Sequence, residues 1–131
     1  MERTPINPVT WSLDMGFTQG ELVTGASRTL YLSGQTAMDQ SGRPQHDGDI
    51  AGQLALALDN VEATLRAADM TLAHLVRLNV YTTDVDALFP HYGILAGRLA
   101  AAGVTPTTTM LGVTRLAVPG QLVELEGTAV A

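Results

Sequence analysis

Two acidic residues near the end of this 131-residue chain are its best candidates for acid–base chemistry. Glu124 and Glu126 lie in the run Val123-Glu124-Leu125-Glu126, in which apolar and acidic residues alternate. In a β-strand this alternation puts both carboxylates on one face and the apolar side chains on the other. In a dry site the two carboxylates would raise each other's pKa, as a general acid or base requires. The residues alone favour the other interpretation, a solvated strand face.

Other polar residues offer weaker chemistry. The segment His46-Asp47-Gly48-Asp49 contains metal-ligand residue types, but it has no second histidine at ligand spacing, so turn and helix-capping roles are favoured over a metal site. His91 and Tyr92 are adjacent and could form an acid–base pair, or His91 could pack beside its leucine neighbours. Ser33 lacks the Gly-x-Ser-x-Gly pattern of a hydrolase nucleophile.

The composition excludes several kinds of catalysis. The chain has no cysteine, so it has no thiol nucleophile, disulfide or cysteine-held metal centre. All seven of its Lys and Arg residues are arginine. Without lysine the chain has neither the amine of a pyridoxal enzyme nor the lysine of a P-loop NTPase.

The charge balance bears on partners. The net charge is −6 and the arginines are scattered singly, which argues against nucleic-acid binding. No apolar run approaches the ~20 residues of a membrane span and no signal core follows the first residues, so we expect a cytoplasmic protein. Charged residues make up 15% of the chain and hydrophobic residues 46%, so we expect copies of the chain to cover part of its surface.

Hydrophobic spacing predicts the elements that position these residues. Residues 22–26 and 28–36 are expected to be two strands joined by a glycine-containing turn. Leucine and valine then recur at helical spacing, which predicts a helix over residues 49–68 with Asp47 or Asp49 as its N-cap.

The second half of the chain is expected to contain one further helix. It begins at Asp84 or Asp86, ends at Gly103 and accepts Pro90 only in its first turn. Three strands are expected around it, at residues 75–81, 107–113 and 122–129.

The resulting order, β-β-α-β-α-β-β, predicts an α+β sandwich with one domain over residues 1–131. Its two helices would cover one face of one mixed sheet. We expect apolar side chains on the uncovered face, which would also require other copies of the chain to cover them.

Several sequence blocks match a known family pattern in order and near-family spacing. The blocks are Gly16-Phe17-Thr18-Gln19, Leu32-Ser33-Gly34-Gln35, Gln53 with Leu58-Asp59-Asn60-Val61, residues 76–81 followed by Asp84, and Val113-Thr114-Arg115-Leu116 leading to Val123-Glu124-Leu125-Glu126. Together they resemble the Rid family of reactive intermediate deaminases, also called YjgF-type and once named L-PSP endoribonucleases. The resemblance extends from about Phe17 over nearly the whole remaining chain.

The resemblance implies a chorismate-mutase-like α+β fold that assembles as a homotrimer with ligand clefts between subunits. It also implies hydrolysis of imines or enamines, such as 2-aminoacrylate and 2-iminobutanoate, to 2-keto acids and ammonia, with no cofactor and no metal. In such enzymes an arginine grips the substrate carboxylate, and a glutamate with backbone groups positions the attacking water.

When the family pattern is carried over residue by residue, the family glutamate falls on Glu124. The resemblance therefore favours a role for Glu124 in the site over a solvated strand face. The Ser-Gly-Gln block supplies Gly34, whose backbone lines the cleft in relatives. The family's N-terminal aromatic residue, usually tyrosine, falls on Phe17, which keeps the ring and loses the hydroxyl.

The family pattern fails at the arginine. Relatives of the deaminase type read Pro-x-Arg where this chain reads Pro106-Thr107-Thr108, so Thr108 replaces the carboxylate-binding residue. Met110 replaces a frequent cysteine and Tyr92 a common asparagine, while Arg115 matches a different family arginine and is expected to form a surface ion pair. Losing the bidentate contact would cost about 2–5 kcal/mol of substrate binding, so the cleft suits a larger or neutral ligand.

Three functions remain as alternatives. The first is a Rid-type hydrolase of altered specificity in which Glu124 is catalytic. The second is a ligand-binding or regulatory trimer that uses the same cleft without turnover. The third, an endoribonuclease, is disfavoured by the acidic charge. The roles of Glu126 and His91 stay open, and the expected substrate-binding residues are Phe17, Gly34, Tyr92, Thr108 and Met110.

Overall fold

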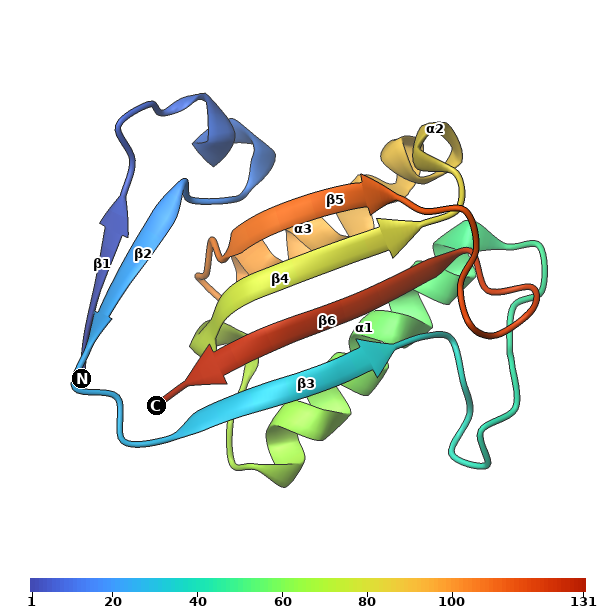
Figure 1. Ribbon diagram of the computed structural model, residues 1–131, viewed down its shortest axis with the longest axis horizontal. Helices are drawn as coiled ribbons and strands as arrows, with labels where there is room; N and C mark the ends of the chain where they lie inside the picture. Colours follow the sequence, from blue (N-terminus) through green and yellow to red (C-terminus); the bar gives the residue numbers. More distant parts are fainter.

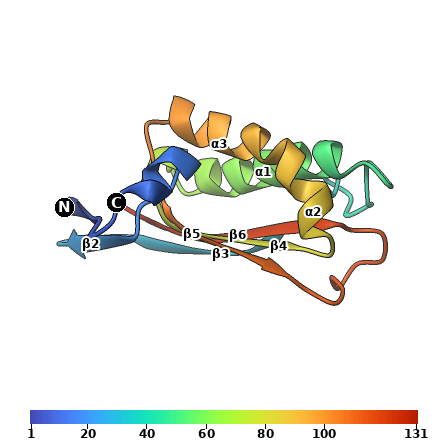
Figure 2. The same ribbon diagram turned by 90° about the horizontal axis from the view of Figure 1, so that it is seen from above.

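A computed structural model describes residues 1–131 as a four-stranded sheet with helices packed on one face (Figures 1 and 2). The strands, in spatial order, are β3 (Thr29–Gln35), β6 (Val123–Val130), β4 (Leu75–Thr82) and β5 (Thr107–Gly112). Strands β4 and β5 are parallel and the other neighbours are antiparallel, so the sheet is mixed, as predicted.

Helix α1 (Ile50–Ala67) confirms the first predicted helix. It begins where it does because the side chain of Asp49 accepts a hydrogen bond from the backbone N–H of Gly52 at 3.0 Å, which satisfies a free donor of the first turn. Its leucine-rich face packs against β3 and β6. None of the helices has the length and the hydropathy needed to cross a membrane.

The second predicted helix is divided near Pro90. It consists of α2 (Val85–Leu88), a 3-10 turn (Phe89–His91) and α3 (Tyr92–Ala101), and Asp84 is its N-cap as predicted. Pro90 has no N–H to donate and its ring crowds the preceding turn, so a continuous helix through this position was the wrong prediction.

The core lies between the helices and the sheet. Alternate residues of the strands and the apolar stripes of α1 and α3 meet there and are almost wholly buried. The main contributors are Leu54, Leu58, Val61, Leu65, Leu78, Val80, Leu95, Leu99, Val123 and Leu125.

The face of the sheet away from the helices is polar, so the expectation of an apolar uncovered face was wrong. Strand alternation sends the apolar residues of β4 and β6 toward the helices and leaves the polar ones on the other side. On the four-stranded sheet, Tyr31 and Leu111 are the large exposed apolar side chains. The polar residues of β4 and β6 on this face are Arg77, Asn79, Tyr81, Glu124, Glu126 and Thr128.

Near the N-terminus the chain forms a second, two-stranded sheet that the sequence did not predict. Strand β2 (Gly20–Thr24) pairs with β1 (Glu2–Ile6) and not with β3, so the expected hairpin between residues 22–26 and 28–36 is absent. Strand β1 escaped prediction because it is short and contains charged residues and Pro5.

Arg3 holds this N-terminal hairpin against the rest of the protein. Its guanidinium pairs with Glu21 of β2 and donates hydrogen bonds to the carbonyls of Ala73 at 2.6 Å and Leu75 at 2.8 Å. Between the two strands the chain forms a 3-10 helix (Trp11–Met15), which lies beside α3 on the helix side of the sheet (Figure 2).

Replacing Arg3 with methionine removes the ion pair and both carbonyl contacts while keeping a long side chain. We expect faster amide hydrogen exchange in β1 and β2 and little change in α1, because the hairpin is held apart from the core. Arg28→Met is the matched control, since Arg28 donates to the carbonyl of Ala68 outside the hairpin. Equal acceleration of hairpin exchange in both variants would contradict the assigned role of Arg3.

Candidate functional site

The residues that the sequence singled out fall into two groups on opposite faces of the sheet. On β5, Thr108 is in register with Leu78, whose side chain is buried beneath the helices. On β6, Glu124 is in register with Tyr81 on the polar face. Because side chains alternate along a strand, Thr108 and Glu124 face in opposite directions. A single copy of the chain therefore does not bring them together.

The first group lines an aromatic hollow of about 210 Å³ between β5, α3 and the N-terminal 3-10 helix. Four of the residues expected to bind substrate contribute to it, and sequence reasoning missed three others, Trp11, Met15 and Phe89. No periodicity signals these three, because they reach the hollow through the folding of two separate turns onto α3. The full lining is Trp11, Met15, Phe17, Phe89, Tyr92, Thr108 and Met110.

The aromatic hollow has hydroxyl groups but no charged side chain. The Thr108 hydroxyl donates to the carbonyl of Pro106 at 2.9 Å, so its proton is already committed. Burial raises the pKa of the Tyr92 phenol, which keeps this hydroxyl a neutral donor at physiological pH. The hollow therefore offers no cation to a substrate carboxylate.

The second group consists of Glu124 and Gly34. The Glu124 carboxylate lies so close over the backbone of Gly34 that a Cβ there would collide with Glu124 Oε1. The pairing of β3 with β6 shifts register between Leu32 and Gln35, next to this contact. Glu124 is half-buried and forms no ion pair or hydrogen bond with another protein group, so its oxygens are free to accept from water.

Glu126 shares the face of Glu124, as predicted, but it has a different environment. The Tyr81 hydroxyl and the Asn79 side-chain amide both donate to Glu126 Oε1, the amide at 2.9 Å. The hydrogen bond to Glu126 is the main cause of a raised pKa of Tyr81, and desolvation adds to it. Glu126 is thus held in a hydrogen-bond network with β4, whereas Glu124 has no protein partner.

Two other candidates have simpler roles. His91 is exposed in the 3-10 turn and makes no hydrogen bond with Tyr92, so neither the acid–base pair nor the packed histidine is found. In the segment 46–49, Asp49 caps α1, and His46 Nδ1 lies 4.0 Å from the Asp49 carboxylate. This is the turn and capping role that the sequence favoured.

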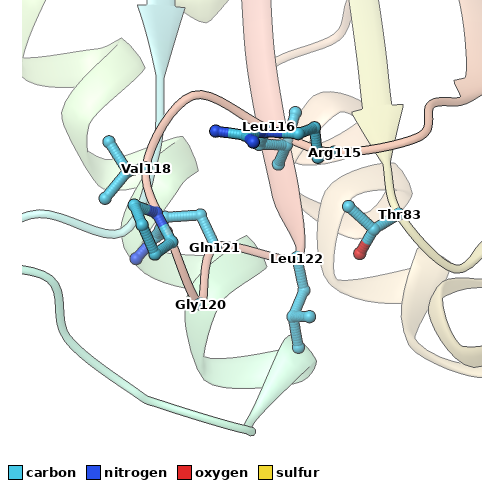
Figure 3. Close-up of a pocket in the computed structure, with 8 residues that line it drawn as sticks. Thr83, Arg115, Leu116, Val118, Gly120, Gln121 and Leu122 are labelled. Atoms are coloured by element: carbon cyan, nitrogen blue, oxygen red, sulfur yellow. The ribbon is translucent and has the colours of Figure 1, made fainter.

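A second hollow, of about 430 Å³, lies at the loop that connects β5 to β6 (Figure 3). Thr83 faces it from the end of β4, and residues of the loop form the remaining wall. Arg115 lines this hollow, is exposed and has no carboxylate within 4.0 Å, so the expected surface ion pair is absent.

Gln53 fixes the end of the same loop. Its buried side chain donates to the carbonyls of Gly120 at 3.0 Å and His46 at 3.1 Å, and accepts from the N–H of Leu122 at 2.7 Å. These bonds tie the start of α1 to the start of β6, two residues before Glu124. The glutamine in the family-like block therefore has a structural role that helps to position the second group.

Comparison with known proteins relates nearly the whole chain to one family. Residues 16–131 match the family model described as Endoribonuclease L-PSP. The RutC family protein YjgH of Escherichia coli (strain K12) is 33% identical over 88 residues, which are 67% of this chain and 66%, just under two thirds, of that protein.

Solved structures agree with this assignment. YyfB of Yersinia pestis, a member of the conserved Rid protein family, superposes with a TM-score of 0.84 at 31% identity and covers 100% of both chains. TdcF of E. coli, solved with bound serine, has a TM-score of 0.70 at 26% identity and covers 88% of this chain and 87% of its own.

Replacing Glu126 with glutamine should lower the pKa of Tyr81 toward its ordinary value of about 10, because the charged acceptor is lost. The pKa of Tyr81 is measured from tyrosinate absorbance in an alkaline titration. Both proteins also carry Tyr31→Phe and Tyr92→Phe, so that Tyr81 is the only tyrosine that titrates. Since the pKa of Tyr81 is raised by folding, the network stabilises the fold below pH ~10 and is lost as pH rises through the folded value. Glu124→Gln is the control; an equal shift there would contradict the assigned hydrogen bond.

Proposed function

This chain belongs to the endoribonuclease L-PSP family, which includes the Rid proteins, and we propose that it hydrolyses the C=N bond of a reactive imine metabolite, including the imine that an enamine forms by tautomerisation. The observation that carries this proposal is the half-buried Glu124 carboxylate, which lies over Gly34 without a protein partner. A carboxylate in that state can hold and activate a water molecule. The proposed setting is the cytoplasm, with no cofactor or metal.

The proposed site lies between subunits of a homotrimer. Glu124 and Gly34 occupy one face of the sheet, and the aromatic hollow with Thr108 occupies the other. A cleft that combines them needs one group from each of two neighbouring copies. The polar face supports such an assembly, because its side chains offer donors and acceptors to a second copy.

The proposed reaction needs only water and one base. Glu124 accepts a proton from a bound water, whose oxygen attacks the imine carbon and converts the C=N bond to a carbinolamine. The nitrogen takes up the proton that Glu124 received and then the proton of the carbinolamine hydroxyl, so the C–N bond breaks and ammonia leaves as the carbonyl forms. Imine and water thus give a carbonyl compound and ammonia, with no change of oxidation state.

Specificity is proposed to differ from that of relatives with an arginine in the cleft. TdcF has been solved with bound serine, a small amino acid, so a relative holds a small charged ligand. Here Thr108 stands at the position matched to the arginine, and no cation lines the aromatic hollow. The loss of a bidentate contact costs about 2–5 kcal/mol, so small 2-imino acids should be poor substrates.

The alternative is a trimer that binds a ligand or regulates another process without turnover. The absence of a cation from the aromatic hollow favours it, because the substrate carboxylate loses its partner. RNA cleavage, which the family description names, is disfavoured by the net charge of −6 and the scattered arginines.

The first test couples the protein to a threonine dehydratase, which supplies 2-iminobutanoate. We expect the natural chain to hydrolyse 2-iminobutanoate slowly. Thr108→Arg should raise kcat/KM by about tenfold or more, because it restores the contact with the substrate carboxylate. Adding Glu124→Ala to Thr108→Arg should abolish this activity. Gly34→Ala should also lower the rate, because it displaces the Glu124 carboxylate. Glu2→Ala, an exposed glutamate on β1, is the matched control.

Fast turnover by the natural chain that only Glu124→Ala abolishes would show that the arginine is dispensable. No turnover in any variant, including Thr108→Arg, would favour the ligand-binding alternative.

The second test concerns the subunits. Light scattering should give a mass near three times the 13.8 kDa of one chain. Co-expression of the natural chain with a Thr108→Arg, Glu124→Ala double variant should restore fast hydrolysis of 2-iminobutanoate. Each chain alone lacks one group, but a mixed cleft has the introduced arginine from the double variant and Glu124 from the natural chain beside it. A monomer, or no gain on mixing, would contradict an intersubunit site.

A further inference from the structure

We propose that the ligand of this cleft carries an uncharged, ring-sized apolar group, which Trp11 and Phe89 select by holding it in the aromatic hollow against β5 and α3. This ligand class rests on the proposed function, because both concern the same cleft. The inference adds the chemical class of the ligand and two specificity-determining residues outside the family-like blocks.

The wall of the aromatic hollow is built from aromatic rings. Trp11 and Phe17 meet edge to face, with ring centroids 5.8 Å apart and an interplanar angle of 84°. Such pairs are favourable beyond the area they bury, so each ring limits the motion of the other. Trp11 is nevertheless 59% exposed and Phe89, which lines the same hollow, is 50% exposed. Large aromatic surfaces left open around a hollow mark a binding site.

The N-terminal segment holds this wall in place before any ligand arrives. Asn7 Oδ1 accepts hydrogen bonds from the Thr18 hydroxyl and the Gln19 N–H, both at 2.8 Å. The Thr18 N–H also donates to the carbonyl of Thr105, just before β5. These bonds fix the segments on both sides of the 3-10 helix to each other and to the residues just before β5. A preformed wall lowers the ordering cost of binding.

The size of the hollow fits one ring with a small substituent. Its volume is about 210 Å³, whereas an engineered apolar cavity of about 150 Å³ in another protein binds benzene. A substrate with only a methyl or ethyl side chain would leave most of this apolar surface in contact with water. A ring would cover it and gain the corresponding hydrophobic stabilisation.

The charge pattern favours a neutral group. No cation lines the aromatic hollow, and the Thr108 hydroxyl proton is committed to Pro106. Asp14, on the same 3-10 helix as Trp11, adds a negative charge to the adjacent hollow, which shares Met15 and Tyr92 with the aromatic one. A carboxylate placed here would lose hydration without gaining a partner. The free Tyr92 hydroxyl can donate to a neutral carbonyl or amide.

Trp11 is the only tryptophan in the chain, so its intrinsic fluorescence reports on the aromatic hollow directly. The probes are phenylacetamide, the isosteric but charged phenylacetate, and acetamide, which lacks the ring. We expect a saturable change with phenylacetamide, binding of phenylacetate weaker by about tenfold or more, and no saturation with acetamide. Tighter or equal binding of phenylacetate, or no saturation with phenylacetamide, would overturn the inference.

Variants locate the binding. Phe89→Ala should weaken phenylacetamide binding by about tenfold, while Leu22→Ala, a similarly exposed apolar residue on β2, should leave it unchanged. If Phe89→Ala does not fold, Trp11→Ala gives the same test and should weaken phenylacetamide binding. Because Trp11 is the fluorophore, binding to this variant is measured by titration calorimetry. Thr108→Arg should reverse the preference toward phenylacetate. Equal effects of Phe89→Ala and Leu22→Ala would place the ring elsewhere and refute the assignment.

This test separates the two proposals because it measures binding without turnover. Ring binding together with failure of every hydrolysis assay would refute the hydrolase and leave the ligand class standing. Imine hydrolysis without ring binding would refute the ligand class alone.

Discussion

The two-residue period of the β-strand constrains everything else in this molecule. On β6 it sends Val123 and Leu125 into the core and leaves Glu124 on the opposite face. On β5 the same period turns Thr108 toward the helices. No side-chain rotation can bring Glu124 to Thr108 across the sheet. The fold thus supplies two half-sites that face in opposite directions, and any chemistry that needs both must recruit a second copy of the chain.

Local signals were enough to predict part of this fold. Helix α1 is long, periodic and capped by Asp49, so its prediction needed no knowledge of the rest of the chain. Pairings over long distances were not predictable in the same way. The interaction of Arg3 with the carbonyls of Ala73 and Leu75 joins residues about seventy positions apart, and the ion pair of Arg3 with Glu21 joins β1 to β2. The polarity of the uncovered face follows from the alternation of apolar and polar residues in β4 and β6, which overrides the general tendency of an open sheet face to be apolar.

The candidate site divides in the same manner. Strand alternation predicted that Glu124 and Glu126 lie on one face. It could not predict their different hydrogen bonding, because this depends on neighbouring residues of β3 and β4. Tyr81 and Asn79 engage Glu126, whereas Gly34 leaves room for the Glu124 carboxylate. The family resemblance pointed to four residues of the aromatic hollow, one that matches the family pattern approximately and three that depart from it. Trp11, Met15 and Phe89 could not be predicted, because they reach the hollow only through the long-range packing of the N-terminal segment beside α3.

The outer edge of β3 has a consequence for how chains meet during folding. Because β2 pairs with β1, this edge of the main sheet has no partner strand and exposes backbone donors and acceptors. Such edges invite uncontrolled strand addition and aggregation. The register shift between Leu32 and Gln35 in the pairing of β3 with β6 makes the end of β3 irregular, and irregular strands are poor templates for strand addition. The same irregularity that accompanies the close approach of Glu124 to Gly34 therefore also shortens the template on which misfolded chains could stack.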